Sequence, residues 1–167
     1  MRKLLIVILG LICLSAIMAY GLKKMGYGLT YQPTASMPRG FYWIFPPRDL
    51  KKNDIVLFRP PWRFRKFLLS HHFIPDSGIL MKYVAGVPGD EVCNQQGVLT
   101  INHRTLAPLY QFYEGIKPLP RKAFCQRLKD NQYLLISLKE NHSFDGRYMG
   151  STNKNDILGK CRKMINE

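Results

Sequence analysis

An uninterrupted apolar run near the N-terminus is the strongest pattern along the chain. Residues 4–22 carry no charge; two basic residues precede them, and Lys23 and Lys24 follow. About 20 apolar residues in a helix cross the hydrocarbon layer of a bilayer. The run therefore predicts a transmembrane anchor at residues 1–24, followed by a separate domain at residues 25–167.

A cleavable secretory signal is the alternative interpretation of this run. Such a signal ends in a small-x-small motif, and with Ala19 as its last residue the position two before it is Ile17. The pattern therefore favours an uncleaved anchor. Basic pairs flank both ends, so the excess of basic residues on the cytoplasmic side does not by itself fix the orientation. The simplest arrangement keeps the short N-terminal stub inside and the remaining chain outside.

Behind the anchor, the apolar runs are short and are interrupted by glycine and proline. This rhythm is typical of an all-β domain and predicts a mainly β fold with one N-terminal helix. Residues 87–90 (VPGD) have the chemistry of a turn, since proline sets one dihedral and glycine accepts positive φ. Helical periodicity is weak here. The best strand candidates are residues 41–45, 54–58, 79–87, 98–102 and 133–138.

Composition and charge narrow the function classes. The 167 residues fit one domain of ordinary size plus a short appendage. Hydrophobic residues make up 46% and charged residues 22%, which excludes a disordered chain and a collagen-like repeat. A formal net charge of +14 indicates an anionic neighbour, either nucleic acid or membrane head groups.

Residues 59–69 (RPPWRFRKFLL) interleave cations with aromatic residues. A surface that rests Trp62 and Phe64 at head-group level while Arg63 and Lys66 meet anionic lipid has this composition. Single-stranded nucleic acid also binds such surfaces. Because the anchor already places the segment at a membrane, lipid rather than nucleic acid is the expected partner.

The four cysteines lack the spacing of a zinc site, so we expect no metal or other cofactor. Cys13 lies in the predicted anchor, and the other three lie in the soluble part. In an oxidising compartment two of these could pair, and Cys93 with Cys125 is the favoured pair because each borders a strand candidate. Three unpaired cysteines that act as small apolar side chains are the alternative.

A serine between two prolines is the first candidate catalytic residue. Ser36 lies between Pro33 and Pro38, directly before the aromatic strand candidate at residues 41–45. A stiff backbone and an exposed hydroxyl suit a nucleophile. An ordinary turn serine is the alternative, because serine and proline are common in turns.

A lysine within an apolar run is the second candidate. Strand alternation puts Lys82 on the same face as Leu80 and Val84. Burial on that face would lower the lysine pKa, so that the neutral amine could act as a general base near neutral pH. The alternative is an edge-strand lysine whose ammonium group reaches solvent.

The histidines give weaker signals. His71 and His72 are neighbours in sequence, whereas the partners of a catalytic triad come together through the fold. His103 falls in a predicted hairpin turn, and no H-E-x-x-H motif surrounds His142. We expect structural or surface roles for all four.

A polar segment at residues 143–150 (SFDGRYMG) follows the last strand candidate. Asp145 and Arg147 within it can form an ion pair that pins the loop. By itself the segment is typical of a structural turn.

Together, the three segments resemble the type I signal peptidase family of serine–lysine peptidases. The family motif S-M-P-x-G is matched at residues 36–40, and K-x-V-x-G-x-P-G-D at residues 82–90. The third motif, S-x-D-S-R-Y-x-G, is matched at residues 143–150 except that Gly146 replaces a serine. The resemblance covers most of the soluble chain and implies a signal-peptidase-like β domain.

The resemblance also implies a role for each matching residue. Ser36 would attack the scissile carbonyl carbon, and neutral Lys82 would take its proton and deliver it to the leaving amine. The Thr34 side chain and the Ser36 backbone N–H would form the oxyanion hole, where one donor is typically worth about a hundredfold to a thousandfold in rate. The lysine-orienting and supporting positions fall on Ser143, Asp145 and Arg147.

Within the family, the short third motif and the small size resemble the conjugal-transfer branch, whose members process pilin precursors. The expected protein is a single-pass serine endopeptidase of the cytoplasmic (inner) membrane with its catalytic domain on the periplasmic side. Its expected substrate is an exported precursor with small residues at the first and third positions before the cut. Hydrolysis and cyclisation of the product both stay open.

Two other function classes also stay open. A non-catalytic, membrane-anchored assembly component of a transfer apparatus would keep the fold and the charge without the reaction. A DNA-linked serine–lysine autoprotease would share the dyad, but the transmembrane run and the lack of a helix-turn-helix pattern disfavour it.

Overall fold

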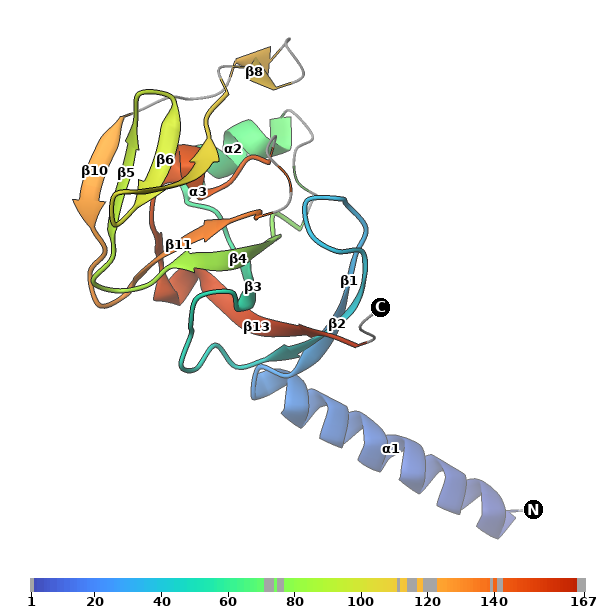
Figure 1. The fold of residues 1–167 in the computed structure, drawn as a ribbon. Helices are drawn as coiled ribbons and strands as arrows, with labels where there is room; N and C mark the ends of the chain where they lie inside the picture. The colour runs from blue at the N-terminus through green and yellow to red at the C-terminus, as the bar shows by residue number, and fades with distance from the viewer. Residues whose placement is uncertain are drawn as a thin grey trace.

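An N-terminal helix projects from a β domain, as Figure 1 shows. The structure is a computed structural model, and it describes residues 2–70, 74, 77–110, 112–113, 117–118, 123–138, 140 and 143–164. Helix α1 spans Arg2–Lys24, and none of its residues is buried. The helix is long and apolar enough to cross a membrane, which is consistent with the predicted anchor.

The domain consists of antiparallel strands, which confirms the predicted mainly β class. The strands that form a large sheet are β1 (Gly28–Gln32), β2 (Gly40–Phe45), β3 (Ile55–Phe58), β4 (Leu80–Gly86), β11 (Gln132–Ile136), β12 (Thr152–Asn153) and β13 (Ile157–Lys163). A smaller sheet contains β5 (Glu91–Gln95), β6 (Val98–Ile101), β7 (Arg104–Pro108) and β10 (Phe124–Arg127). A separate pair joins β8 (Phe112–Tyr113) and β9 (Lys117–Pro118).

The order of the strands in the large sheet is β1-β2-β13-β3-β4-β11-β12, and in the smaller sheet it is β10-β5-β6-β7. All five predicted strands are present, as β2, β3, β4, β6 and β11, although β11 ends at Ile136 rather than at residue 138. The predicted turns are also confirmed, because Gly89 has φ 89° and His103, between β6 and β7, has φ 65°.

Strand β13 was not predicted. It is an interior strand of the large sheet and lies between β2 and β3. Its sequence, ILGKCRK, contains three cations and a glycine, and so lacks the apolar run of a central strand. Backbone pairing with both neighbours holds it in place, and Ile157 and Cys161 are buried.

The two sheets share one hydrophobic core. Val56, Val84 and Leu134 of the large sheet are 0% exposed and belong to the same cluster as Val92 and Leu99 of the smaller sheet. Burial of these side chains is the main favourable contribution to folding. The core therefore fixes the smaller sheet against the strands that carry the candidate site.

Residues 59–69, the segment expected to face lipid, have only part of their apolar surface exposed. Most of the segment forms helix α2 (Trp62–Ser70), and Figure 1 draws this helix at the opposite end of the domain from α1. Leu68 is buried, and Phe64 and Phe67 pack against the core. The spacing of these three residues matches one face of a helix. Only Trp62, at 76%, is a strongly exposed aromatic residue of this helix.

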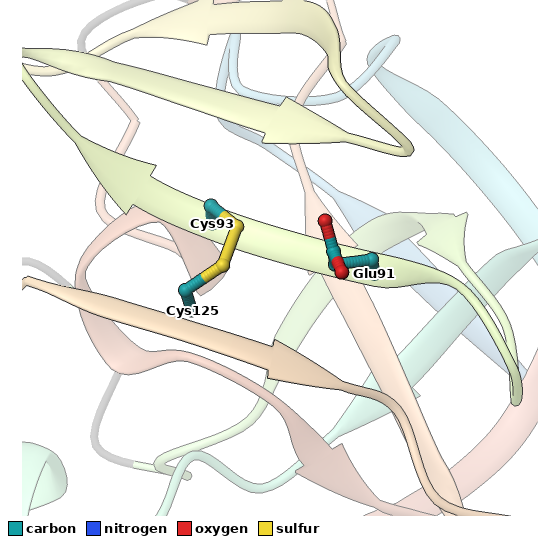
Figure 2. Close-up of side chains that lie close together, drawn as sticks. All are labelled: Glu91, Cys93 and Cys125. Atoms are coloured by element: carbon teal, nitrogen blue, oxygen red, sulfur yellow. A yellow bond between two sulfur atoms is a disulfide. The ribbon is translucent and has the colours of Figure 1, made fainter.

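A disulfide joins Cys93 on β5 to Cys125 on β10, as Figure 2 shows. The two cysteines are register partners in adjacent strands, and the favoured pairing is confirmed. Cys161 is free and buried, and Cys13 is free and exposed on α1. The other short helical segments are α3 (Gly146–Met149) and the 3-10 turn η1 (Lys154–Asp156).

Candidate active site

The connection between β1 and β2 carries Ser36. The two strands pair from Gly28↔Ile44 to Gln32↔Gly40, so both ends of the connection are held in the sheet. The Tyr42 hydroxyl donates to the Pro38 carbonyl oxygen at 2.6 Å, and Met37 is 1% exposed in a small apolar cluster. These contacts immobilise the backbone directly after Ser36, while the Ser36 side chain stays partly accessible.

Strand β4 positions Lys82 beside Ser36. The Lys82 Nζ and the Ser36 Oγ are 3.1 Å apart, and the Lys82 residue is 2% exposed. Strand β4 lies between β3 and β11, and Lys82 is the register partner of the fully buried Val56. The edge-strand alternative is therefore wrong, because the amine lies in the interior of the sheet and away from water.

Burial lowers the pKa of Lys82 from the ordinary 10.5 to about 8, because removal from water disfavours the ammonium form. Asp145 and Glu140 raise this pKa by attraction, and Arg147 lowers it by repulsion, but desolvation is the largest cause. The ammonium form donates a hydrogen bond to the Ser36 Oγ. Once Lys82 is neutral, its lone pair can accept the Ser36 proton across the same contact.

The Thr34 hydroxyl also contacts the candidate nucleophile. Its Oγ1 lies 3.2 Å from the Ser36 Oγ. Gln32 Nε2 donates to the same Thr34 Oγ1 at 2.6 Å and to the Thr34 carbonyl oxygen at 3.2 Å. Gln32 uses one lone pair of the Thr34 hydroxyl, which leaves its proton and its second lone pair available for the contact with Ser36.

The third motif forms a buried ion pair. Arg147 Nη2 and Asp145 Oδ2 are 2.9 Å apart, Arg147 Nε donates to Asp145 Oδ1 at 2.9 Å, and both residues are 0% exposed. The Asp145 carboxylate also accepts from the Arg147 backbone N–H, and so caps α3. The predicted ion pair is confirmed. Two parallel charge-assisted hydrogen bonds fix its geometry.

Ser143, two residues before Asp145, is buried, and its backbone N–H donates to the Glu140 carbonyl oxygen at 3.4 Å. Within the described ranges, no hydrogen bond joins the Ser143 side chain to Lys82. The lysine-orienting role of Ser143 therefore stays a prediction.

The sequence did not single out two residues that contact the segment around Ser36. Gln32 supports Thr34, and Ser137 donates its hydroxyl proton to the Ser36 carbonyl oxygen. Gln32 stands only two residues before Thr34 in the sequence, and this closeness is a weak indication that their side chains are in contact. Ser137 is 101 residues from Ser36 in the sequence, so that only the tertiary fold reveals the contact.

Gly146 departs from the family motif for a steric reason. A Cβ added at Gly146 would lie 2.7 Å from the Leu135 carbonyl oxygen and 2.9 Å from Leu134 Cδ1. Helix α3 therefore approaches the backbone of β11 too closely for any side chain at this position.

Another cluster lies outside this site. Figure 2 shows Glu91, Cys93 and Cys125 side by side. Their potential metal-ligand atoms all lie within 4.8 Å of one another. The two sulfurs are bonded to each other, so they cannot act as thiolate ligands. His103 contacts Glu91 at the surface, with Nε2 3.4 Å from Oε1. Three histidines, His71, His72 and His142, lie outside the described residues.

Comparison with known proteins identifies the class. Residues 1–165 match the family model described as signal peptidase, peptidase S26, and the chain belongs to this family. Two Escherichia coli relatives, each named "Plasmid transfer protein TraF", are each 29% identical to it. The alignment with one covers 83% of both chains, and the alignment with the other covers 92% of this chain and 93% of the relative.

Two further proteins of the class are more distant or shorter matches. A Synechocystis protein named "Probable signal peptidase I-2" is 29% identical over 68% of this chain and 47% of its own length. The crystal structure of a signal peptidase I from Enterococcus faecalis V583 has 16% sequence identity and a TM-score of 0.40, and covers 68% of this chain and 97% of that one.

Restoring the family's serine is expected to destabilise the domain. In Gly146→Ser the new side chain would overlap the Leu135 carbonyl oxygen, and such overpacking costs about 1–3 kcal/mol. Urea unfolding measures this loss. Gly28→Ser is a matched control, because a Cβ at Gly28 would meet only Ile44, at 3.5 Å. Equal unfolding midpoints for the two variants would contradict the steric explanation.

Proposed function

We propose that the chain is a membrane-anchored serine endopeptidase in which Ser36 and Lys82 form the catalytic dyad. The observation that carries the proposal is the 3.1 Å contact between the Ser36 hydroxyl and an amine that is 2% exposed. Membership of the signal peptidase family supports the peptidase class. The reaction is the removal of a leader segment from an exported precursor.

In the first half of the reaction, the Ser36 Oγ attacks the scissile carbonyl carbon while the Lys82 Nζ takes the hydroxyl proton. The Ser36 backbone N–H and the Thr34 hydroxyl stabilise the negative charge that develops on the carbonyl oxygen. Lys82 then passes its proton to the leaving amine as the peptide bond breaks. The product of this half is an ester between Ser36 and the leader, together with the released amine of the mature protein.

The second half depends on the nucleophile that attacks this ester. If water attacks, Lys82 accepts its proton, the leader leaves as a carboxylic acid and Ser36 recovers its own proton. In a cyclising enzyme the acyl group belongs to the mature protein, and the amino terminus of the same molecule replaces water. The two outcomes differ by one water, so that mass spectrometry would give a ring about 18 Da lighter than the linear product.

The proposed substrate comes from the relatives. Both TraF proteins are named for plasmid transfer, and they match this chain over most of its length. We therefore propose that the precursor is a pilin-type subunit of a conjugal transfer system. Small residues at the first and third positions before the cut are expected from the family.

An apolar surface next to the anchor supports a membrane-proximal site. Leu29 faces Trp43 and Tyr31 faces Phe41 across β1 and β2, and each of the four residues is 47–54% exposed. Apolar surface of this kind next to a membrane span fits the head-group region of a bilayer. We propose that this surface, rather than α2, contacts lipid. Ser36 lies in the connection between the same two strands, and so it would lie close to the membrane.

The Cys93–Cys125 disulfide supports an extracytoplasmic location for the domain, because disulfides persist in oxidising compartments. Leaders of exported proteins are cut on that side of the membrane. We therefore propose that the short N-terminal stub is cytoplasmic.

Removal of either dyad residue is expected to abolish precursor cleavage. The experiment uses the full-length protein in proteoliposomes with a pilin-type precursor, and gel electrophoresis reports the product. Ser36→Ala removes the nucleophile and Lys82→Ala removes the base, and both variants should stay folded in the membrane. Lys129→Ala, at an exposed lysine, is the control and should cleave normally. Undiminished cleavage by Ser36→Ala or Lys82→Ala would exclude the dyad. A wild-type protein that does not cleave the precursor would favour a non-catalytic assembly component.

The cleavage rate is also expected to depend on pH. Lys82 accepts a proton only in its neutral form, so the rate should rise with pH through a midpoint of about 8. Initial rates over about pH 6 to about pH 10 measure the midpoint. A rate that does not change over this range would argue against a titrating lysine.

A further inference from the structure

We propose that Ser137 is a positioning residue that couples the peptide of the nucleophile to the buried Asp145–Arg147 ion pair. Ser137 follows the last residue of β11 and is 3% exposed. None of the three family motifs contains it. The inference rests on the proposed function, because it concerns the placement of Ser36 for attack.

The Ser137 hydroxyl connects two backbone groups. Its Oγ donates to the Ser36 carbonyl oxygen and accepts from the Glu140 backbone N–H at 3.3 Å. A hydroxyl has one proton, and the bond from Glu140 occupies one of its lone pairs. The proton is therefore directed at Ser36.

The backbone of Ser137 is bound to the ion pair. Its N–H donates to Asp145 Oδ2 at 2.9 Å, and its carbonyl oxygen accepts from Arg147 Nη2 at 2.9 Å. Asp145 and Arg147 are both 0% exposed, and Arg147 Nη2 also donates to the Glu140 carbonyl oxygen at 2.8 Å. The Ser137 hydroxyl therefore projects from a backbone that two charged groups hold in place.

The smaller sheet supports the same network. Asn94 on β5 is buried, and its side-chain amide donates to the Arg147 carbonyl oxygen. Asn94 follows Cys93, whose disulfide joins β5 to β10. A continuous series of polar contacts thus leads from the core of the domain to the carbonyl group of Ser36.

The Ser36 carbonyl belongs to the peptide bond between Ser36 and Met37. Rotation of this peptide would move the Ser36 Oγ relative to the Lys82 Nζ. A misplacement of about 1 Å in an active site can cost about a hundredfold in rate. Loss of the Ser137 hydroxyl is therefore expected to lower kcat, while KM stays near its wild-type value because the substrate contacts are kept.

The pH profile separates positioning of Ser36 from an effect on Lys82. Desolvation is the main cause of the lowered Lys82 pKa, and in the part of the chain that the structure describes no hydrogen bond joins Ser137 to Lys82. The pH midpoint of cleavage should therefore stay at about 8 when the Ser137 hydroxyl is removed.

The test compares Ser137→Ala with Ser137→Thr in the full-length protein acting on the pilin-type precursor. Ser137→Ala should lower kcat about tenfold to a hundredfold with KM and pH midpoint unchanged. Ser137→Thr keeps a hydroxyl and should recover most of the kcat. Ser151→Ala is the matched control: Ser151 accepts a hydrogen bond from Gln126 Nε2 at 3.1 Å, away from Ser36, and its loss should leave kcat unchanged.

Several results would overturn the positioning role. One is wild-type kcat in Ser137→Ala, and another is an equal loss of kcat in the Ala and Thr variants. If Ser137→Ala does not fold, Ser137→Cys replaces it, since a thiol is a weaker donor of similar size. An intermediate kcat is expected for this variant, and wild-type kcat would again overturn the role.

The Ser36→Ala variant keeps the two proposals apart. Cleavage by Ser36→Ala would refute the proposed function itself. Inactive Ser36→Ala together with fully active Ser137→Ala would refute only the role of Ser137.

Discussion

Keeping one amine out of water is the constraint on which the site depends. Burial lowers the pKa of Lys82 from 10.5 to about 8, and a pKa difference of one corresponds to about 1.36 kcal/mol. Below about pH 8 the folded protein holds a buried ammonium group, at a cost on the order of 3 kcal/mol relative to a solvated lysine. Between about pH 8 and 10.5 the unfolded chain binds this proton and the folded chain releases it, so stability rises with pH. The same burial makes the neutral amine available at a lower pH than in a solvated lysine.

The rest of the site keeps a hydroxyl within reach of that amine. Tyr42 holds the Pro38 carbonyl oxygen, and Ser137 holds that of Ser36. The backbone of Ser137 is in turn hydrogen-bonded to the Asp145–Arg147 pair, which is fully buried. A buried ion pair adds little net stability, because desolvation opposes its attraction. Its role here is geometric, because it holds the end of β11 and the start of α3 beside the segment that carries Ser36.

The sequence was sufficient to single out Ser36 and Lys82, whose side chains lie 3.1 Å apart, and the main strands around them. Lys82 stands in an apolar run with strand alternation, which made it a candidate for burial, and its place between β3 and β11 decides against the edge-strand alternative. Ser137 could not be found in this way, because its contact with Ser36 spans 101 residues. Strand β13 was missed because backbone pairing, rather than an apolar run, holds it in the sheet. The reason why residue 146 is glycine rather than serine is likewise tertiary. It depends on the close approach of α3 to β11, which cannot be predicted from the neighbouring sequence.

An NMR titration of the Lys82 amine, in the full-length protein with isotope-labelled lysine, would measure directly whether burial lowers the pKa of this group. The Lys82→Ala spectrum assigns the signal by its disappearance, and the remaining lysines serve as internal references. A titration midpoint of about 8 is expected for Lys82 if the amine is held out of water. A midpoint near 10.5, as for a solvated lysine, would contradict it, because the amine would then be charged at the pH at which it must accept a proton.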